Sequence, residues 1–286
     1  NKFELSVGLP VFNGEQFLKK RLDSILKQTF KNFEIIISDN GSEDTTQQIC
    51  KEYAKKFEQI RYIRNEVNRG YIWNFNFVLN KSNSKYFVWA AIDDVWENNF
   101  IEKNLIPLKN NSNIISSISK IQIIGEKNIE DKLTKNSFYK KFRDNYLLIK
   151  RDSFENKVKF FLKRNKGTNV YGVYKTKELK KIVKNAPIID WDLAITLGSL
   201  KYGEINEIED VLMYKYLGGF SSGTFYNFVK NHNVRFFQLI FPEIPFFVWF
   251  KNTFGLKLFL KNLGWFTKIF IFSEYQILVG YLKKDS

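Results

Sequence analysis

The sequence predicts an α/β fold in which helices cover both faces of a mostly parallel sheet, followed by a helical extension rich in aromatic and basic residues. Strand-like apolar runs alternate with helix-length segments over the first 124 residues, which is typical of βαβ units. Residues 86–92 are almost continuously apolar, as expected of a parallel strand buried on both faces. After residue 222 the composition changes, and Phe and Trp interspersed with Lys and Arg predict the extension.

The predicted elements follow one another in a regular order. The first strand ends near Pro10, and the turn signal Asn13-Gly14 precedes a segment whose apolar residues recur at helical spacing. Strands are predicted at residues 5–12, 33–39, 60–64, 86–94, 114–124, 169–174 and 207–216. Helices are predicted at residues 15–26, from about 44 to 57, after Gly70, from about 98 to 108, at 177–183 and at 190–200. Residues 125–167 are predicted as a charged, loop-rich connection with one helix.

Composition limits the function classes. The net charge of +15 favours anionic partners, among them nucleic acid, anionic lipid and phosphorylated small molecules. No nucleic-acid reader motif is recognised, so we expect no nucleic-acid partner. The chain has no G-x-G-x-x-G after the first strand and no G-x-x-x-x-G-K-[ST], which argues against a dinucleotide dehydrogenase and a P-loop NTPase. The lone Cys50 excludes an internal disulfide, and no secretory leader is expected.

Acidic residues follow two of the predicted strands. Asp39 ends the second strand, and Asp93 and Asp94 end the fourth. In open α/β sheets ligands bind just beyond the carboxyl ends of the strands. Two adjacent carboxylates there suit Mg²⁺ or Mn²⁺ together with substrate phosphates. The alternative is a turn with two solvated acids.

Four motifs together resemble a known family. They are Leu-Pro-Val-Phe-Asn-Gly at residues 9–14, Ser-Asp-Asn-Gly-Ser-Glu-Asp at 38–44, Ile-Asp-Asp at 92–94 and Ile-Asp-Trp-Asp at 189–192. In this order and spacing they resemble the family 2 glycosyltransferases, which have the Rossmann-like GT-A fold and invert the anomeric carbon. The resemblance covers about residues 3–222. It implies a catalytic domain at 1–222, with a nucleotide-binding half to about 124 and an acceptor-side half at 125–222, before an amphipathic helical segment at 223–286.

The resemblance also implies roles for single residues. Asp94 would be the direct ligand of Mn²⁺ or Mg²⁺, and Asp93 would face the ribose or a metal-bound water. The positions that would bind or brace the nucleotide are Pro10, Val11, Asn13, Glu15, Asp39, Asn40, Arg69, Gly70, Asp93 and Lys215. Asn74 is read as an ordinary polar helix residue and is left out of the site.

On the acceptor side, Asp190 matches the acidic catalytic base of the family. Asp192 competes with it, and either residue is also suited to cap the helix that follows. Tyr171, Gly172 and Trp191 would complete the acceptor side together with Asp192.

The sequence departs from the family pattern in three places. Ala91 stands where the first acid of the usual D-x-D triplet is expected. Lys215 replaces an Arg after the last strand, and the His expected nearby is missing. Two carboxylates remain, so metal affinity is expected to depend on the nucleotide.

The segment at 223–286 lacks an uninterrupted apolar run of the roughly 20 residues that span a bilayer. One predicted helical face carries Leu256, Phe259, Leu260 and Leu263, beside Lys257 and Lys261. Such a basic amphipathic helix can lie in a membrane interface. Packing onto the catalytic domain and a homo-oligomer interface are the alternatives. We expect a cytoplasmic protein, with peripheral attachment to the inner face of the cell membrane left open.

The sequence thus predicts an inverting, metal-dependent glycosyltransferase. The donor would be a nucleotide sugar, with UDP-sugars favoured. The acceptor would be a glycan or lipid-linked hydroxyl in cell-surface polysaccharide, glycolipid or glycoprotein synthesis. Two alternatives remain: a polyprenyl-phosphate sugar synthase of the same fold, and a non-catalytic nucleotide-sugar-binding assembly protein.

Overall fold

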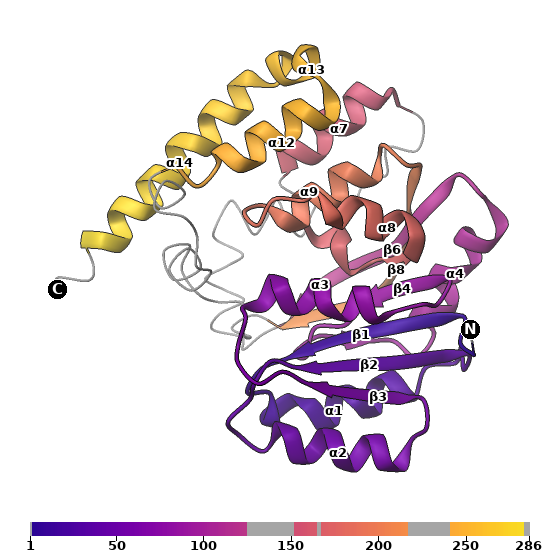
Figure 1. Ribbon diagram of the computed structural model, residues 1–286. Coiled ribbons are helices and arrows are strands. Elements are labelled where there is room, and N and C mark those ends of the chain that lie inside the picture. The colour runs from indigo at the N-terminus through magenta and orange to yellow at the C-terminus, as the bar shows by residue number, and fades with distance from the viewer. Residues whose placement is uncertain (1, 125–151, 165–166, 217–240, 283–286) are drawn as a thin grey trace.

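The computed structural model describes residues 2–124, 152–164, 167–216 and 241–282 (Figure 1). The strands are β1 (Leu5–Val11), β2 (Phe33–Asp39), β3 (Ile60–Arg64), β4 (Tyr86–Trp89), β5 (Val95–Trp96), β6 (Ile114–Ile124), β7 (Val173–Lys175) and β8 (Glu204–Tyr216). The first helices are α1 (Glu15–Leu26), α2 (Thr46–Lys56), α3 (Tyr71–Lys81) and α4 (Phe100–Asn110). The later ones are α7 (Phe154–Arg164), the 3₁₀ helix η1 (Gly167–Tyr171), α8 (Thr176–Lys184), α9 (Trp191–Ser199), α12 (Ile244–Phe254), α13 (Leu256–Lys261) and α14 (Leu263–Leu282).

The described strands form one eight-stranded sheet in the order β3-β2-β1-β4-β7-β6-β8-β5. β1 pairs in parallel with β2 and β4, and β6 pairs in parallel with β8. β7 and β5 run antiparallel to their neighbours. The predicted fold class, a mostly parallel α/β sheet with helices on both faces and a C-terminal helical region, is confirmed.

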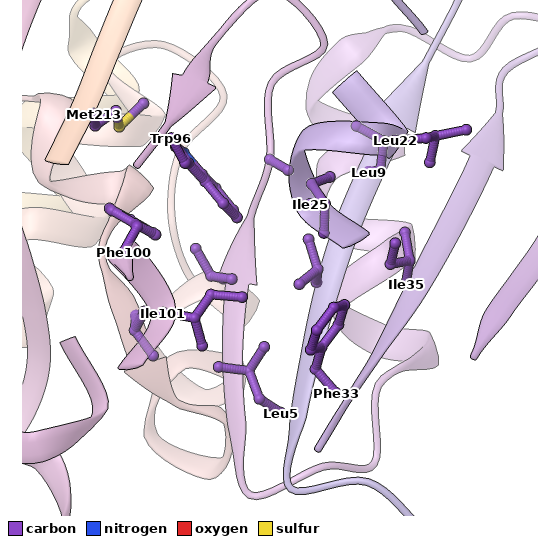
Figure 2. Packing of buried hydrophobic residues seen from close by; sticks show 14 of the residues in the cluster. Leu5, Leu9, Leu22, Ile25, Phe33, Ile35, Trp96, Phe100, Ile101 and Met213 are labelled. Atoms are coloured by element: carbon purple, nitrogen blue, oxygen red, sulfur yellow. The ribbon is translucent and has the colours of Figure 1, made fainter. Parts of the chain in front are cut away.

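One face of the sheet is covered by α1, α2 and α4. Apolar side chains of these helices and of the strands form a single buried cluster. Figure 2 shows part of it, from Leu22 and Ile25 on α1 to Phe33 and Ile35 on β2. Because the helical spacing of α1 places its apolar residues on one face, that face packs against the strands β1 and β2.

The opposite face is covered by α3, α8 and α9 (Figure 1). Here Trp89 of β4 lies at the centre of an aromatic group. Its ring centre is 5.2 Å from that of Trp191 and 5.1 Å from that of Phe87. The start of α9 is therefore held directly against the central strand.

The C-terminal helices form a further layer on α9 and α7 (Figure 1). Phe246, Phe250, Leu258 and Phe266 are buried against residues of those two helices. Packing onto the rest of the chain, one of the alternatives left open by the sequence, thus occurs for the described part of this segment. Within the part of the chain that the structure describes, no helix is long and apolar enough to cross a membrane.

Two predicted strands differ from the structure. β4 ends at Trp89 rather than at residue 94, because the chain turns at Ile92 and Asp93 and returns to the sheet as β5 at its other edge. The apolar residues that follow Trp89 extended the predicted strand beyond its true end.

The predicted strand at 169–174 is mostly the 3₁₀ helix η1, and only Val173–Lys175 pair in the sheet. The carbonyl of Asn169 accepts hydrogen bonds from the Gly172 N–H at 3.0 Å and the Tyr174 hydroxyl at 2.7 Å, which closes a turn. A Cβ at Gly172 would lie 2.9 Å from the Ser117 carbonyl oxygen, so the close approach requires glycine. Of the predicted connection at 125–167, the one helix is α7, and residues 125–151, 165 and 166 lie outside the described residues, as does the predicted domain boundary at 222.

Candidate functional site

The loops after β1 and β2 are joined by side-chain hydrogen bonds. Asn13 accepts from the Glu43 N–H at 2.9 Å, and its own N–H donates to Ser42 Oγ at 2.9 Å. Glu15 Oε2 accepts from the N–H and the hydroxyl of Thr45. Asn13 and Glu15, both predicted for the nucleotide site, therefore brace one loop against the other.

Asp39 is fully buried at the end of β2. Its carboxylate accepts from the Ser42 N–H at 2.8 Å and the Tyr62 hydroxyl at 2.9 Å, and Arg64 Nε lies 3.5 Å away. Burial and then the hydrogen bond to Asp39 raise the pKa of Tyr62, so its hydroxyl remains a donor. The carboxylate is thus fixed in orientation by partners from two segments, the loop after β2 and the strand β3.

Asn40 holds the loop that precedes α3. Its side-chain amide donates to Asn68 Oδ1 at 2.8 Å and to the Gly70 carbonyl at 3.2 Å, and its oxygen accepts from the Arg69 N–H at 3.3 Å. Gly70 has a φ of 86°, a conformation that favours glycine. Arg69 is exposed, and its guanidinium lies 4.9 Å from the ring centre of Trp73. The loop therefore presents a fixed cation beside the strand ends.

Asn74 is a bracing residue that sequence reasoning set aside. From α3 its amide donates to the Ser38 carbonyl at 2.9 Å and the Val11 carbonyl at 3.4 Å. The Val11 carbonyl also accepts from the Asn40 N–H at 2.8 Å. Pro10 and Val11 are buried, so their contribution to a ligand site is through the backbone at the end of β1.

Asp93 and Asp94 lie in the turn between β4 and β5. Asp94 is 2% exposed, and neither of its carboxyl oxygens has a hydrogen-bond partner among the residues that the structure describes. Burial raises the pKa of Asp94 to about 6, against the opposing charges of Lys215 and Arg21. Burial of a carboxyl whose oxygens lack hydrogen-bond partners costs free energy, unless a ligand binds to those oxygens.

β8 brings Lys215 to these acids. Val95 pairs with Tyr214 in the antiparallel ladder. One residue further along the same register, Asp94 lies opposite Lys215. The ammonium lies 4.1 Å from the ring centre of Tyr171. Burial lowers the pKa of Lys215, but Tyr171 and Asp94 outweigh it and raise the pKa above its ordinary value. Lys215 therefore stays protonated and places a positive charge next to Asp93 and Asp94.

Arg21 is a second cation near Asp93 and Asp94, and it was not predicted from the sequence. It is 2% exposed on α1, with its guanidinium 4.1 Å from the ring centre of Trp96. Burial lowers its pKa to about 10, and Asp94 and Asp93 oppose that shift. The signal in the sequence was its position, since it stands on the otherwise apolar face of α1.

The donor set at this turn fits a divalent cation in part. Among the described residues, no three His, Cys, Asp or Glu side chains gather as a ready metal cluster. The two unsatisfied oxygens of Asp94 are the hard ligands that Mg²⁺ and Mn²⁺ prefer. Lys215 and Arg21 place positive charge beside them. The residues therefore fit a cation whose remaining ligands come from phosphate oxygens.

The residues predicted for the acceptor side surround the start of α9. The Asp192 carboxylate lies against Gly167 of η1, where a Cβ would clash with it. Trp191 is buried, with its ring centre 5.8 Å from that of Phe75, so it holds α9 in place through packing. Burial raises the pKa of the Tyr171 hydroxyl, while Lys215 lowers it and Asp192 raises it. Tyr171 therefore lies between the acidic turn and the start of α9.

Asp190 stands at the N-cap position of α9 with a φ of 54°, yet its side chain makes no capping hydrogen bond. Its carboxyl lies instead within hydrogen-bonding reach of Glu243, which is 2% exposed at the start of α12. Burial, then Glu243 and Asp192, raise the pKa of Asp190 well above its usual range. Glu243 was not predicted as a site residue, although a single acid between two prolines in an apolar stretch was a visible signal.

Comparisons with known proteins bear on the family of the chain. The family model described as "Glycosyl transferase family 2" matches residues 6–170. An uncharacterized glycosyltransferase of Haemophilus influenzae is 35% identical over 123 residues, which are 43% of this chain and 38% of that protein. The uncharacterized glycosyltransferase MJ1057 of Methanocaldococcus jannaschii is 27% identical over 281 residues, covering 90% of this chain and 92% of that one. GlyA of Streptococcus pneumoniae is 38% identical over 99 residues, only 14% of its length.

Solved structures share the fold. TarS of S. aureus in complex with UDP-GlcNAc superposes with a TM-score of 0.57 at 17% identity, covering 80% of this chain and 64% of that one. The mannosyltransferase PcManGT of Pyrobaculum calidifontis, in complex with GDP-Man and Mn²⁺, gives 0.50 at 13% identity, covering 75% and 57%. The predicted GT-A fold is thereby confirmed. The family model matches more than half of the length of this chain, so the chain belongs to glycosyl transferase family 2.

Proposed function

We propose that this chain transfers a sugar, with inversion, from a nucleotide-sugar donor to an acceptor hydroxyl, and that a divalent cation assists. The observation that carries the proposal is Asp94, a buried carboxyl with two unsatisfied oxygens beside the cation Lys215. A nucleoside diphosphate with its metal ion would supply a ligand for the Asp94 oxygens and negative charge for Lys215. The strand ends around them are the edge at which open α/β sheets bind ligands.

In this proposal the nucleoside lies over the ends of β1 and β2. Backbone groups of Pro10 and Val11 and the braced residues Asp39 and Asn40 would shape its pocket. Arg69 is exposed and would reach the diphosphate or base. The solved neighbours carry UDP-GlcNAc in one case and GDP-Man in the other, and we favour a UDP-sugar here.

Asp94 would hold Mn²⁺ or Mg²⁺, with Asp93 toward the ribose or a metal-bound water. When bound, the cation neutralises charge on the diphosphate leaving group. Lys215 supplies a second positive charge on the same side, as a point charge without the fork geometry of an arginine. Since Lys215 and Arg21 already oppose Asp94, metal affinity is expected to be low until the nucleotide is bound.

Asp190 would act as the general base. The acceptor oxygen forms a bond to the anomeric carbon as its proton moves to the carboxylate, and the bond from that carbon to the diphosphate breaks on the opposite face. One such displacement inverts the anomeric configuration. Asp192, Tyr171, Gly172 and the helix start held by Trp191 would position the acceptor.

We further propose a peripheral contact between the C-terminal helices and an anionic lipid surface, which fits a glycan or lipid-linked acceptor in cell-surface synthesis. Several large apolar side chains are exposed there: Val248, Leu256, Leu260, Leu263, Ile271, Phe272 and Tyr275. Leu263, Ile271 and Tyr275 recur at spacings of four or eight and so share one face of α14. Among the described residues of these helices, Lys251, Lys257, Lys261 and Lys268 are exposed. Apolar side chains among cations complement an anionic interface.

Vesicle flotation tests this contact. The chain should float with phosphatidylglycerol vesicles and not with phosphatidylcholine vesicles, and Ile271→Glu with Phe272→Glu should abolish it. A control double change of exposed polar residues far away, Lys51→Glu with Glu52→Lys, should leave flotation unchanged. Equal flotation on neutral vesicles, or a shift to dimers that the Glu variants abolish, would contradict the membrane proposal and favour an interface between copies.

A thermal-shift panel tests the donor site. UDP, GDP, dTDP and CMP would each be added with and without Mn²⁺ to the wild type and to Asp94→Asn. A nucleotide at about 100 times its dissociation constant stabilises by roughly 2.7 kcal/mol. We expect one nucleotide, UDP by preference, to raise the melting temperature in a Mn²⁺-dependent way that Asp94→Asn loses. No shift with any nucleotide would refute the donor site and favour the assembly-protein alternative.

Substitution of Asp190 tests the alternative of a polyprenyl-phosphate sugar synthase. A phosphate acceptor is already an anion and needs no strong base, so a variant Asp190→Asn that keeps its transfer rate would favour a polyprenyl-phosphate acceptor.

A further inference from the structure

The Asp190 carboxyl is available for chemistry because the helix does not use it. A residue at an N-cap commonly turns its side chain back onto the helix N–H groups. Asp190 adopts the left-handed conformation and makes no such hydrogen bond. Its Oδ2 is shielded from solvent and accepts no hydrogen bond from any described residue.

Glu243 meets this carboxyl from the other end of the chain. It precedes α12, and its Oε1 accepts a hydrogen bond from the Ser273 hydroxyl of α14. Its Oε2 is also shielded and, like Asp190 Oδ2, has no donor among the described residues. The two carboxyl groups lie within hydrogen-bonding reach of each other. Two buried acids thus each present an oxygen that lacks a donor, at the same place.

A proton between the two groups resolves the arrangement. Two carboxylates in contact cannot both ionise at low cost, because each disfavours the charge of the other. If one is protonated, it donates to the other and both shielded oxygens are satisfied. Two further acids act in the same direction, namely Asp192 on Asp190 and Glu274 on Glu243. Tyr71 also lies near Asp190, and burial raises its pKa, so its phenol stays neutral.

We propose that Asp190 and Glu243 share one proton and work as a pair, with Glu243 as the positioning residue that makes Asp190 a stronger base. The proposal rests on the proposed function, in which Asp190 accepts the acceptor proton. It adds that the C-terminal helices, through Glu243 and its anchor Ser273, are part of the proton-accepting site. Removal of these helices would therefore change the chemistry as well as the stability.

The proton balance of the step is simple. In the form that reacts, the pair holds no proton and carries two negative charges, and this raises the basicity of Asp190. As the acceptor oxygen bonds to the anomeric carbon and the diphosphate leaves with the electron pair of the broken bond, the acceptor proton moves to Asp190. The pair then shares that one proton and keeps one negative charge. One proton returns to water before the next turnover. General-base efficiency is greatest when the pKa of the base lies near the working pH.

Carboxyl ¹³C NMR on the full chain, labelled at Asp and Glu, tests the pair directly. The variants are Asp190→Asn and Glu243→Gln, with Glu274→Gln as a control that removes a neighbouring acid. In the wild type we expect Asp190 to titrate well above the usual range of Asp. Glu243→Gln should lower that midpoint by about one pH unit or more, because an amide donor replaces a like charge. Glu274→Gln should move it much less. Equal midpoints in the wild type and Glu243→Gln would overturn the proposal.

Thermal unfolding against pH is a second readout that needs neither substrate nor resonance assignment. If the groups are coupled, the change in melting temperature with pH for Asp190→Asn/Glu243→Gln will differ from the sum of the single variants. Additive changes at every pH would overturn the proposal.

Activity separates this inference from the proposed function. Release of UDP from UDP-GlcNAc would be followed against pH, and the acidic limb of kcat/KM should move to lower pH in Glu243→Gln. Coupling in the NMR data with full activity of Asp190→Asn would refute Asp190 as the base while the pair stands. Loss of activity in Asp190→Asn with no coupling would refute the pair alone.

Discussion

The buried carboxyl of Asp94 makes a quantitative prediction for the unliganded protein. Burial raises its pKa from 3.8 to about 6. Each unit of pKa difference between folded and unfolded chain corresponds to about 1.36 kcal/mol, so the shift is worth about 3 kcal/mol. Because the folded state holds the proton more tightly, this stability is fully present below the unfolded pKa of 3.8. It is lost as the pH rises through about 6.

Asp94→Asn removes this titration. Urea unfolding in EDTA from about pH 4 to pH 8 would give the free energy of unfolding of the wild type and the variant. We expect their difference to change by about 2.5 kcal/mol across that range, in favour of the variant at high pH, since the unfolded carboxyl is already partly ionised at pH 4. Asp210→Asn is the matched control, since Asp210 is exposed and paired only with Lys103 among described residues. A difference between wild type and Asp94→Asn that does not vary with pH would refute the reasoning.

Three further predictions concern single residues. Asp190→Asn should lower the rate of transfer by roughly 10²- to 10⁴-fold and leave nucleotide binding intact, as measured by turnover and thermal shift; an unchanged rate would contradict its role. Gly70→Ala should cost about 1 kcal/mol or more in unfolding free energy, because its φ of 86° strains any side chain, and should weaken nucleotide binding through the Arg69 loop; unaltered melting and binding would show that the loop relaxes freely. Arg21→Leu should move the pH transition attributed to Asp94 to higher pH, because a cation that favours its charge is lost; an unchanged transition would mean that Arg21 does not act on the acid.

The order of elements and the family were predictable because they depend on local patterns. Apolar runs predicted β1 to β4 and β6, and the helical spacing of apolar residues predicted α1. The polar residues at the ends of those strands were visible for the same reason. The roles assigned to Asp94 and Asp190 remain predictions, but the structure gives both residues unusual surroundings.

The exact end of β4 was not predictable, because Ala90, Ala91 and Ile92 continue the apolar run. Whether they pair or turn depends on what lies beside them, and β5 joins β8 at the far edge of the sheet. The strand predicted at 169–174 failed for a related reason. Its backbone hydrogen bonds close locally around Asn169, and no periodicity in the side chains reports that choice.

The sequence by itself determined the α/β order, the acidic strand ends and the family, because each depends on the pattern of residues that are close together in the chain. Only the tertiary structure decided which charges meet. Arg21 faces Asp94 because α1 packs beneath the turn, and Glu243 faces Asp190 because the C-terminal helices fold back onto α9. These residues are far apart in the chain, and burial, which depends on packing, is what makes their charges act strongly on each other.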